Sequence, residues 1–561
     1  MKNTLHSIDR FTSRMGHFCL IGLLLLSTAA NAQLGINNNK FTRQDTLRGS
    51  IGAERSWWNV LHYDIEVQPH FESKSIEGSN TLQFRVVTPG KTMQIDLQEP
   101  MELKAAIWQN KNLHWEREGN AFHITFPVIL EQGRLETIKL VFAGIPREAI
   151  NPPWDGGWIW KKDAMGRPWM SVACQGLGAS VWYPCKDHQS DEPDSGATLR
   201  IRVPDTLVAV GNGRLKNQQR DPAKKLVTYT WQVVNPINNY DIIPYIGKYI
   251  HWEETYQGEK GPLDCQYWVL DYNESKARKQ FKQVPLMLHC FEYWMGPYPF
   301  YEDGYKLVES SHLGMEHQSA VAYGNHFMNG YLGRDLSGTG WGLKWDFIIV
   351  HESGHEWFGN NITSKDLADM WIHESFTNYS ETLFTTCEYG KEAGDEYCRG
   401  NRKGIRNDRP IIGPYGVNEE GSGDMYNKGG NMIHTIRQVI NDDSLFRKVL
   451  RGLNSCFYHQ TVTSADIENY ISNASGHDFS KVFDQYLRHT DIPVFDYQIQ
   501  NNNLRYRWTN CIPGFDMPVK VRVNNEWIWL SPGTEWQDKQ LTSGGSTLEV
   551  DPNFYVKQKM E

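Results

Sequence analysis

The hydrophobic pattern of this chain changes its period twice, and this change limits the possible folds more than any other feature. Between residue 33 and about residue 255, apolar residues recur at every second position, as in Tyr63, Ile65 and Val67. Turn residues such as Glu77-Gly78 separate these runs. Period-two alternation with turn signals is typical of strands that bury one face. Residues 33–255 are therefore predicted to form one large antiparallel β domain.

The rest of the chain has a different period. From about Ser275 the apolar residues lie three and four apart, and helical segments recur to about residue 490. After Asp491-Ile492-Pro493 the alternation of strands returns, which predicts a small β-sandwich-like domain. A chain of 561 residues is also too long for one hydrophobic core. We expect a multidomain α+β protein with domains at 33–255, 256–492 and 493–561.

The N-terminus has the pattern of an export signal. Three basic residues precede a short apolar run from Phe18 to Leu26, and Ala30-Asn31-Ala32 has the small-x-small pattern of a cleavage site. Residues 1–32 are therefore predicted to be a signal peptide, with a buried N-terminal helix as the alternative. We expect a mature chain in the periplasm or outside the cell. Eight cysteines remain after residue 32, and their spacing does not reveal how they pair.

Charge and hydropathy exclude two classes of partner. The formal net charge is −9 and no block of like charges occurs, which argues against nucleic acid as a partner. No segment after residue 32 is apolar enough to predict a membrane span.

The segment HESGH places two histidines one helical turn apart. His351 and His355 would project from the same face of a helix, and neutral imidazoles at this spacing are typical zinc ligands. Glu352 follows the first histidine and could accept a proton from a metal-bound water. The alternative is a solvated amphipathic helix that happens to carry histidines.

A catalytic zinc site needs a third protein ligand. Glu374 follows His355 by 19 positions on a segment with helical spacing, and a second helix would bring it to face the first. His373 lies about 100° away around that helix, which favours a neighbour without a metal role. Glu381 lies on nearly the same face as Glu374. It could orient a ligating histidine or could be a surface carboxylate.

These segments together resemble a known family. The pattern His-Glu-x-x-His followed by a glutamate after eighteen residues is the signature of gluzincins. The stretch HESGHEWFGNN with WIHESFTNYSE resembles the aminopeptidase N and leukotriene hydrolase family. The positions in register with that family are Trp357, Gly359, Asn360, Trp371 and Glu374.

The resemblance implies an architecture and a metal. It implies an N-terminal β saddle, a thermolysin-like helix-rich catalytic domain and a small C-terminal β sandwich. It also implies one zinc ion per chain, held by His351, His355 and Glu374, with Glu352 as the general base. The chain is expected to be a short form without the helical domain that often follows in this family. Its site is then expected to be more open and to accept longer peptides.

Two more segments carry the family's substrate-binding groups. Gly314-Met315-Glu316 resembles the family's Gly-x-Met-Glu-Asn strand, whose glutamate holds the free α-amino group of the substrate. Here Leu313 replaces the first glycine and His317 replaces the asparagine. A second segment, ACQGLGASVWYPCKD, makes Gln175 the candidate partner of Glu316 at the amine, and a polar turn residue is its alternative role.

The segment DMYNKGG resembles the family's Tyr-x-Lys-Gly helix start. Tyr426 takes the position of the tyrosine that donates a hydrogen bond to the tetrahedral intermediate. Its alternative role is to pack at the start of a helix.

The expected function is zinc-dependent hydrolysis of the first peptide bond of peptides with a free N-terminus. Three alternatives remain: a gluzincin endopeptidase, an epoxide hydrolase on the same zinc site, and a non-catalytic peptide-binding protein. The preferred first side chain, including any contribution of Met315 or Gln175 to it, and the oligomeric state cannot be read from the sequence.

Overall fold

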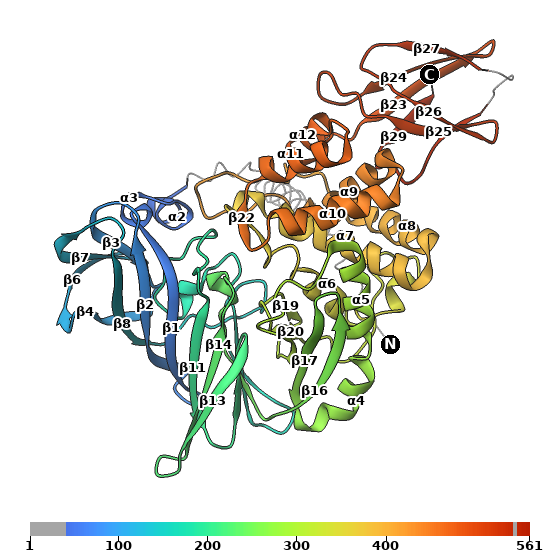
Figure 1. Cartoon of the computed structure of the whole chain (residues 1–561). Helices are drawn as coiled ribbons and strands as arrows, with labels where there is room; N and C mark the ends of the chain where they lie inside the picture. The colour runs from blue at the N-terminus through green and yellow to red at the C-terminus, as the bar shows by residue number, and fades with distance from the viewer. Residues whose placement is uncertain (1–40, 542–546, 561) are drawn as a thin grey trace, which may run out of the picture. The chain divides into compact units, whose positions relative to one another are not determined.

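The computed structural model describes residues 41–541 and 547–560, so the predicted signal peptide lies outside the described residues. The N-terminal part is built on a long sheet in the order β13-β14-β11-β1-β2-β8-β4-β5 (Figure 1). The alternation predicted from the sequence is present, because Tyr63, Ile65 and Val67 of β1 are all fully buried. The strands of this sheet are β1 (Trp58–His70), β2 (Ser75–Val86), β4 (Glu102–Trp108), β5 (Lys111–Asn112), β8 (Leu135–Gly144), β11 (Ala197–Pro204), β13 (Arg214–Asp221) and β14 (Leu226–Val233).

One strand pair in this sheet differs from the antiparallel prediction. β1 and β11 run parallel, while β1 pairs with β2, and β11 with β14, in the antiparallel sense. A parallel pair needs a long connection. Here residues 71–196 supply it, and they form further strands on the way.

Two smaller sheets and the short helices α2 and α3 also belong to the described N-terminal part. One sheet has the order β3-β7-β6 and the other β12-β15-β10-β9. β10 ends at Ala173, two residues before Gln175. The bounds are α2 (Arg43–Gly49), α3 (Ala53–Ser56), β3 (Gly90–Asp96), β6 (His114–Glu118), β7 (Ala121–Leu130), β9 (Gly157–Lys162), β10 (Pro168–Ala173), β12 (Val208–Val210) and β15 (Tyr245–Gly247).

The helix-rich middle contains its own mixed sheet in the order β16-β17-β18-β20-β19. A separate two-stranded sheet pairs β21 with β22 in the parallel sense. The strands are β16 (Tyr249–Gly258), β17 (Gly261–Leu270), β18 (Tyr305–Glu309), β19 (Gly314–Met315), β20 (Val321–Tyr323), β21 (Ile362–Ser364) and β22 (Gln460–Val462). The helices are α4 (Glu274–Gln280), α5 (Gln283–Met295), α6 (Phe347–Gly354), α7 (Trp371–Tyr389), α8 (Lys391–Gly400), α9 (Asn427–Ile440), α10 (Asp443–Cys456), α11 (Ser464–Ser475) and α12 (Ser480–Arg488).

The helical run predicted from Ser275 is divided into two helices. α4 ends at Gln280 and α5 begins at Gln283, with Pro285 in its first turn. A proline lacks the N–H that an interior helical position must donate, but the first turn has no acceptor for that N–H. Pro285 therefore favours the start of a new helix over the continuation of α4.

The C-terminal part consists of two sheets, which agrees with the predicted sandwich-like region. Their orders are β27-β24-β23-β29 and β26-β25-β28. Phe495 and Trp508 in the first sheet belong to the same buried cluster as the helices of the middle part. A second buried cluster lies among the N-terminal strands. The bounds are β23 (Val494–Gln500), β24 (Asn503–Thr509), β25 (Val519–Val523), β26 (Glu526–Leu530), β27 (Gln537–Gln540), β28 (Leu548–Val550) and β29 (Lys557–Met560).

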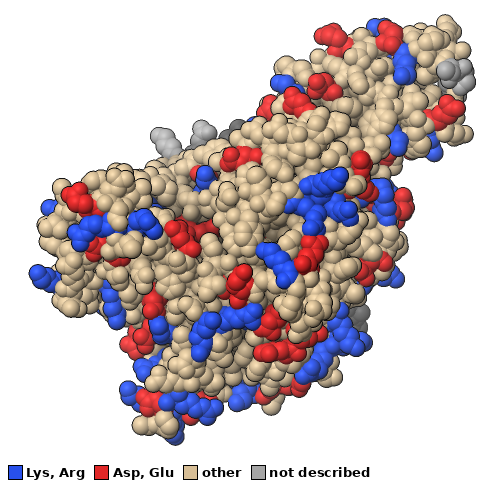
Figure 2. Space-filling view, viewed as in Figure 1, with Lys and Arg blue, Asp and Glu red and all other residues tan. Residues whose placement is uncertain are grey.

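Acidic and basic side chains are interspersed over the face shown in Figure 2. Within the described part of the chain, no helix combines the length and the apolar character that crossing a bilayer requires.

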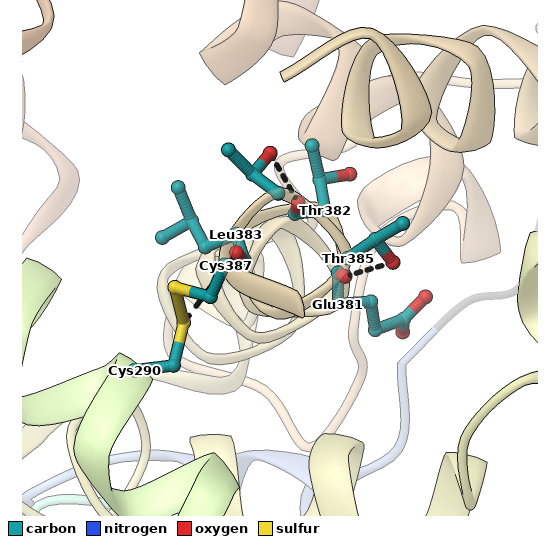
Figure 3. The surroundings of a disulfide bond; sticks show 7 residues. Cys290, Glu381, Thr382, Leu383, Thr385 and Cys387 are labelled. Atoms are coloured by element: carbon teal, nitrogen blue, oxygen red, sulfur yellow. Dashed lines mark hydrogen bonds between the residues drawn. A yellow bond between two sulfur atoms is a disulfide. The ribbon is translucent and has the colours of Figure 1, made fainter. Parts of the chain in front are cut away.

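A disulfide bond joins two helices of the middle part. Cys290 of α5 is bonded to Cys387 of α7, and their Cα atoms lie 6.0 Å apart (Figure 3). Glu381 lies on a different side of α7 from Cys387 in Figure 3. The two cysteines are 97 positions apart, so no local spacing pattern could have indicated this pair.

Loss of this disulfide should lower the stability of the protein. The bond closes a loop of about a hundred residues, and removing such a cross-link typically costs about 2–4 kcal/mol. Cys387→Ser should therefore lower the free energy of unfolding by about this amount in denaturant titrations without reductant. Cys456→Ser is the control, because Cys456 is free and exposed. Equal stability of Cys387→Ser and the wild type would contradict this expectation.

Candidate active site

The last turn of α6 places both histidines of the HESGH segment on one side of the helix. Asp346 caps the start of α6 by accepting hydrogen bonds from the backbone N–H groups of Ile348 and Ile349. His351 lies in the last turn, and His355 follows the helix with backbone angles that remain helical. The two rings are buried, with centroids 5.1 Å apart.

Glu374 approaches this pair from the first turn of α7. Its Oε2 atom lies 3.8 Å from His351 Nε2 and 3.5 Å from His355 Nε2. One ligand atom from each of the three residues lies within 4.8 Å of the others. The structure therefore brings together the three residues that the sequence suggested as metal ligands.

Hydrogen bonds at the other ring nitrogens fix how the histidines point. His351 Nδ1 lies 2.7 Å from Glu381 Oε1, and His355 Nδ1 lies 3.0 Å from the carbonyl oxygen of Phe358. Both Nδ1 atoms face acceptors, so in the neutral tautomer that donates through Nδ1–H each ring has its Nε2 lone pair available for a metal. The free lone pairs are the ones that face Glu374.

Glu381 is a supporting residue and not a surface carboxylate. It is fully buried, and its second oxygen accepts a hydrogen bond of 2.6 Å from the Tyr397 hydroxyl. His373 lies apart from the cluster, because its Nε2 accepts a hydrogen bond from the backbone N–H of Ser364. Burial lowers the pKa of His373 to about 3.

The donor set fits a zinc ion. Two imidazole nitrogens and one carboxylate oxygen are a typical catalytic zinc set, which leaves one position for water or substrate. Glu374 Oε2 is buried without a hydrogen-bond partner, as expected of an atom whose partner is a cation. Although burial acts against it, the charge of Glu374 raises the pKa of His355 to about 10. The site thus stabilises positive charge between these side chains.

Glu352 lies beside the cluster and takes no part in this trio. Burial raises its pKa to about 7. One of its oxygens groups with ligand atoms of Glu316 and His355. A Cβ at residue 314 would lie 2.5 Å from Glu352 Oε1, so only glycine at this position leaves room for the carboxylate. The absence of a side chain at Gly314 therefore makes room for the carboxylate of the candidate base, Glu352.

Tyr426 closes another side of the cluster. It immediately precedes α9, as the sequence suggested, and its ring stacks on that of His351 with centroids 6.2 Å apart. Burial and the nearby charge of Glu374 raise the pKa of Tyr426 well above its ordinary value. The hydroxyl therefore keeps its proton and can donate it in a hydrogen bond.

Glu316 and Gln175 meet, although they are 141 positions apart. Gln175 Nε2 donates a hydrogen bond to Glu316 Oε1, and the Tyr240 hydroxyl donates to the same oxygen at 2.9 Å. Glu316 follows the short strand β19, and its backbone carbonyl accepts a hydrogen bond from Asn360 Nδ2 at 2.8 Å. Burial raises the pKa of Glu316.

His317, which stands where the family has an asparagine, packs directly after Glu316. His317 is fully buried, and its Nδ1 lies 2.7 Å from the Tyr245 hydroxyl. That hydroxyl donates to the carbonyl oxygen of Ala320, so it accepts from His317. The side chain thus supports the segment that follows Glu316.

All the candidate residues line one cavity of about 990 Å³. Gly314 and Met315 form part of its wall, together with apolar side chains such as Trp154 and Phe347. None of the described residues along this cavity is Lys or Arg. Its carboxyl groups belong to Asp155, Glu316, Glu352, Glu374, Glu381, Glu419 and Glu420.

The chain is similar in sequence to known peptidases. Residues 283–486 match the model of the peptidase family M1 domain. The chain is 21% identical over 485 residues to a probable aminopeptidase 1 of Saccharolobus solfataricus, covering 81% of this chain and 59% of that protein. It is 21% identical to leukotriene A-4 hydrolase of Xenopus laevis, covering 74% of this chain and 68% of the relative. The chain thus spans about three fifths of the length of the first of these relatives.

A solved structure has the same fold over most of its length. An M1 zinc metallopeptidase from Deinococcus radiodurans, in a variant bound to a Tyr-Ser-Ala substrate, superposes with a TM-score of 0.66. The match covers 78% of this chain and 95% of the other at 21% identity. A further match with the same TM-score is a two-domain M1 zinc metallopeptidase variant bound to L-tryptophan, at 22% identity. At these identities the similarity establishes the fold.

Proposed function

We propose that this chain is a zinc aminopeptidase that releases the first residue of peptides. The proposal starts from the match of residues 283–486 to the peptidase family M1 domain. The carboxylate of Glu316, buried beside the candidate zinc ligands, is the observation that carries this proposal. It offers a free ammonium group a counter-charge within the same cavity as the metal ligands. Relatives that are named as aminopeptidases support this reading.

The chain's own residues supply the remaining parts of the reaction. Zinc bound by His351, His355 and Glu374 would polarise the scissile carbonyl and lower the pKa of a water molecule. Glu352 would take a proton from the attacking water molecule and pass it to the leaving amine nitrogen. The Tyr426 hydroxyl would donate a hydrogen bond to the carbonyl oxygen as negative charge develops there.

Recognition of the amino terminus decides which bond is cleaved. An ammonium group held by Glu316 puts the first peptide bond near the metal ligands. An internal segment of a peptide brings no charge to this carboxylate, and leaving a buried carboxylate unpaired is costly. The proposed site therefore favours removal of terminal residues over internal cleavage.

Removal of the Tyr426 hydroxyl should slow catalysis without removing the metal. Tyr426→Phe is expected to lower kcat for aminoacyl anilides by about 10²-fold, because a hydrogen bond to the oxyanion is lost. KM and zinc content should change little. Tyr458→Phe is the control, since the Tyr458 hydroxyl donates to the backbone of Pro299 outside the cavity lining. A kcat equal to that of the wild type would assign Tyr426 to packing alone.

A panel of aminoacyl anilides, with and without a chelator, tests the proposed function. Turnover should be lost on chelation and recovered with added zinc. Because carboxyl groups and no Lys or Arg line the described cavity, anilides of glutamate and aspartate should be the poorest substrates of the panel. Failure to cleave any anilide with zinc bound would refute the aminopeptidase. An acidic first residue among the best substrates would refute the inferred role of the cavity's charge.

A further inference from the structure

The turn that carries Gln175 is held by side chains from distant parts of the chain. Within the turn, Leu177 N–H donates to the carbonyl oxygen of Gln175 at 2.7 Å. The Gly176 carbonyl oxygen accepts hydrogen bonds from Arg48 Nη2 at 2.7 Å and from Asn418 Nδ2 at 3.2 Å. A carbonyl oxygen has two lone pairs, so these two donors can fill it. The Gly176–Leu177 peptide group, one residue after Gln175, is therefore held both at its carbonyl oxygen and at its N–H.

Arg48 is itself held in place. It lies in the last turn of α2, and its Nε atom is 3.3 Å from Asp187 Oδ2. The backbone carbonyl of Arg48 accepts a hydrogen bond of 2.8 Å from Arg55, which is fully buried and paired with Asp96. A Cβ at residue 178 would overlap the Arg48 guanidinium, and the φ of Gly178 is +97°. Glycine at this position thus leaves the room in which Arg48 reaches the turn.

Asn418, the second donor to the Gly176 carbonyl oxygen, belongs to another segment that lines the cavity. Asn418, Glu419 and Glu420 all line the cavity that contains the candidate zinc ligands. The residue before Asn418 packs tightly on Gly49, the neighbour of Arg48, where a side chain would overlap the backbone of Val417. The segment 417–420 and the Gln175 turn are thus joined through α2.

We propose that Arg48 and Asn418 are positioning residues for the recognition of a free amino group. By fixing the Gly176 carbonyl, they hold the Gln175 side chain on Glu316, and the oxygen of that side chain can then accept from a substrate ammonium. Without them, the turn must be ordered when substrate binds, and the cost of that ordering appears as weaker binding. This inference rests on the proposed aminopeptidase function.

The kinetic test compares KM with kcat. Arg48→Ala should raise KM for the best aminoacyl anilide by about tenfold, the effect of one strong hydrogen bond, while kcat and zinc content change little. Arg48→Lys should recover part of the loss, because an ammonium can donate to Gly176 but lacks the fork that also reaches Asp187. Arg117→Ala is the matched control: Arg117 also donates to backbone carbonyls, at Gly119 and Met101, outside the cavity lining.

A binding measurement separates positioning from a general structural role. In the Glu352→Ala background, calorimetry would compare L-leucine amide with N-acetyl-L-leucine amide in the zinc-loaded protein. Arg48→Ala should weaken the binding of L-leucine amide by about tenfold, and Asn418→Ala should weaken it by a smaller factor. Neither variant should change the binding of the acetylated ligand. Equal weakening of both ligands, or an unchanged preference for the free amine, would overturn the inference.

The outcomes distinguish this inference from the function on which it rests. If the wild type cleaves no anilide, the proposed function fails. If the wild type is active and both variants keep its KM, the positioning role alone fails. Asn418→Ala removes only a partly exposed amide, so it carries the test if Arg48→Ala does not fold.

Discussion

Glu352→Gln should lower kcat for aminoacyl anilides by about 10³–10⁴-fold and leave zinc bound, because general acid–base groups contribute factors of this size. The amide has nearly the shape of the carboxylate beside Gly314 but cannot take a proton from water. Glu352 is also outside the trio of metal ligands, so the metal should remain. Turnover with the best anilide and metal content by atomic absorption would be measured on the same sample.

The same chemical change at a distant position provides the control. Glu388 lies exposed near the end of α7, so Glu388→Gln should match the wild type in kcat. A zinc-loaded Glu352→Gln protein with normal turnover would show that another group acts as the base. Loss of zinc from this variant would instead make Glu352 part of the metal site.

Glu316→Gln should lower kcat/KM for aminoacyl anilides by about 10³-fold. Breaking a buried charge pair costs about 3–5 kcal/mol, and the ammonium of the substrate would lose its buried partner. The amide oxygen can still accept from Gln175 and Tyr240, so the fold around residue 316 should be kept. The measurement is kcat/KM, with zinc content and thermal unfolding as checks on the protein.

The same variant separates an aminopeptidase from an endopeptidase. An internally quenched peptide with an acetylated N-terminus should resist the wild type and the variant alike. Rapid internal cleavage of this peptide by both proteins, with anilide cleavage also unchanged in the variant, would support the endopeptidase alternative and reject the role given to Glu316.

The elements with strong periodicity could be predicted from the sequence. The alternation at Tyr63, Ile65 and Val67 predicted a strand with one buried face, and β1 has that face. The parallel pairing of β1 with β11 could not be predicted, because alternation specifies which face is buried and not which strand lies beside it. The break between α4 and α5 is marked in the sequence only by Pro285, which is also compatible with a kinked helix.

Some residues of the candidate site could likewise be predicted from the sequence, and others could not. His351 and His355 are linked by helical geometry, and the segment that carries Glu374 has helical spacing, so their meeting could be inferred. Gln175 could be suggested only by resemblance. Tyr240 was missed, because it lies in a short turn, Asn239–Asp241, 76 positions before Glu316 and in no motif. Buried tyrosine hydroxyls usually find a partner, but only the fold shows that this one donates to the carboxylate proposed for the amine.

The position of Tyr240 and Gln175 outside residues 283–486 has a consequence for dissection of the chain. A fragment limited to that range would contain every candidate metal ligand, the candidate base and Glu316, but neither donor to Glu316 Oε1. The candidate metal ligands and the two donors that hold the Glu316 carboxylate are therefore encoded in different stretches of sequence. A chimaera that exchanges residues 44–255 between two such proteins would change the surroundings of the amine without touching a metal ligand.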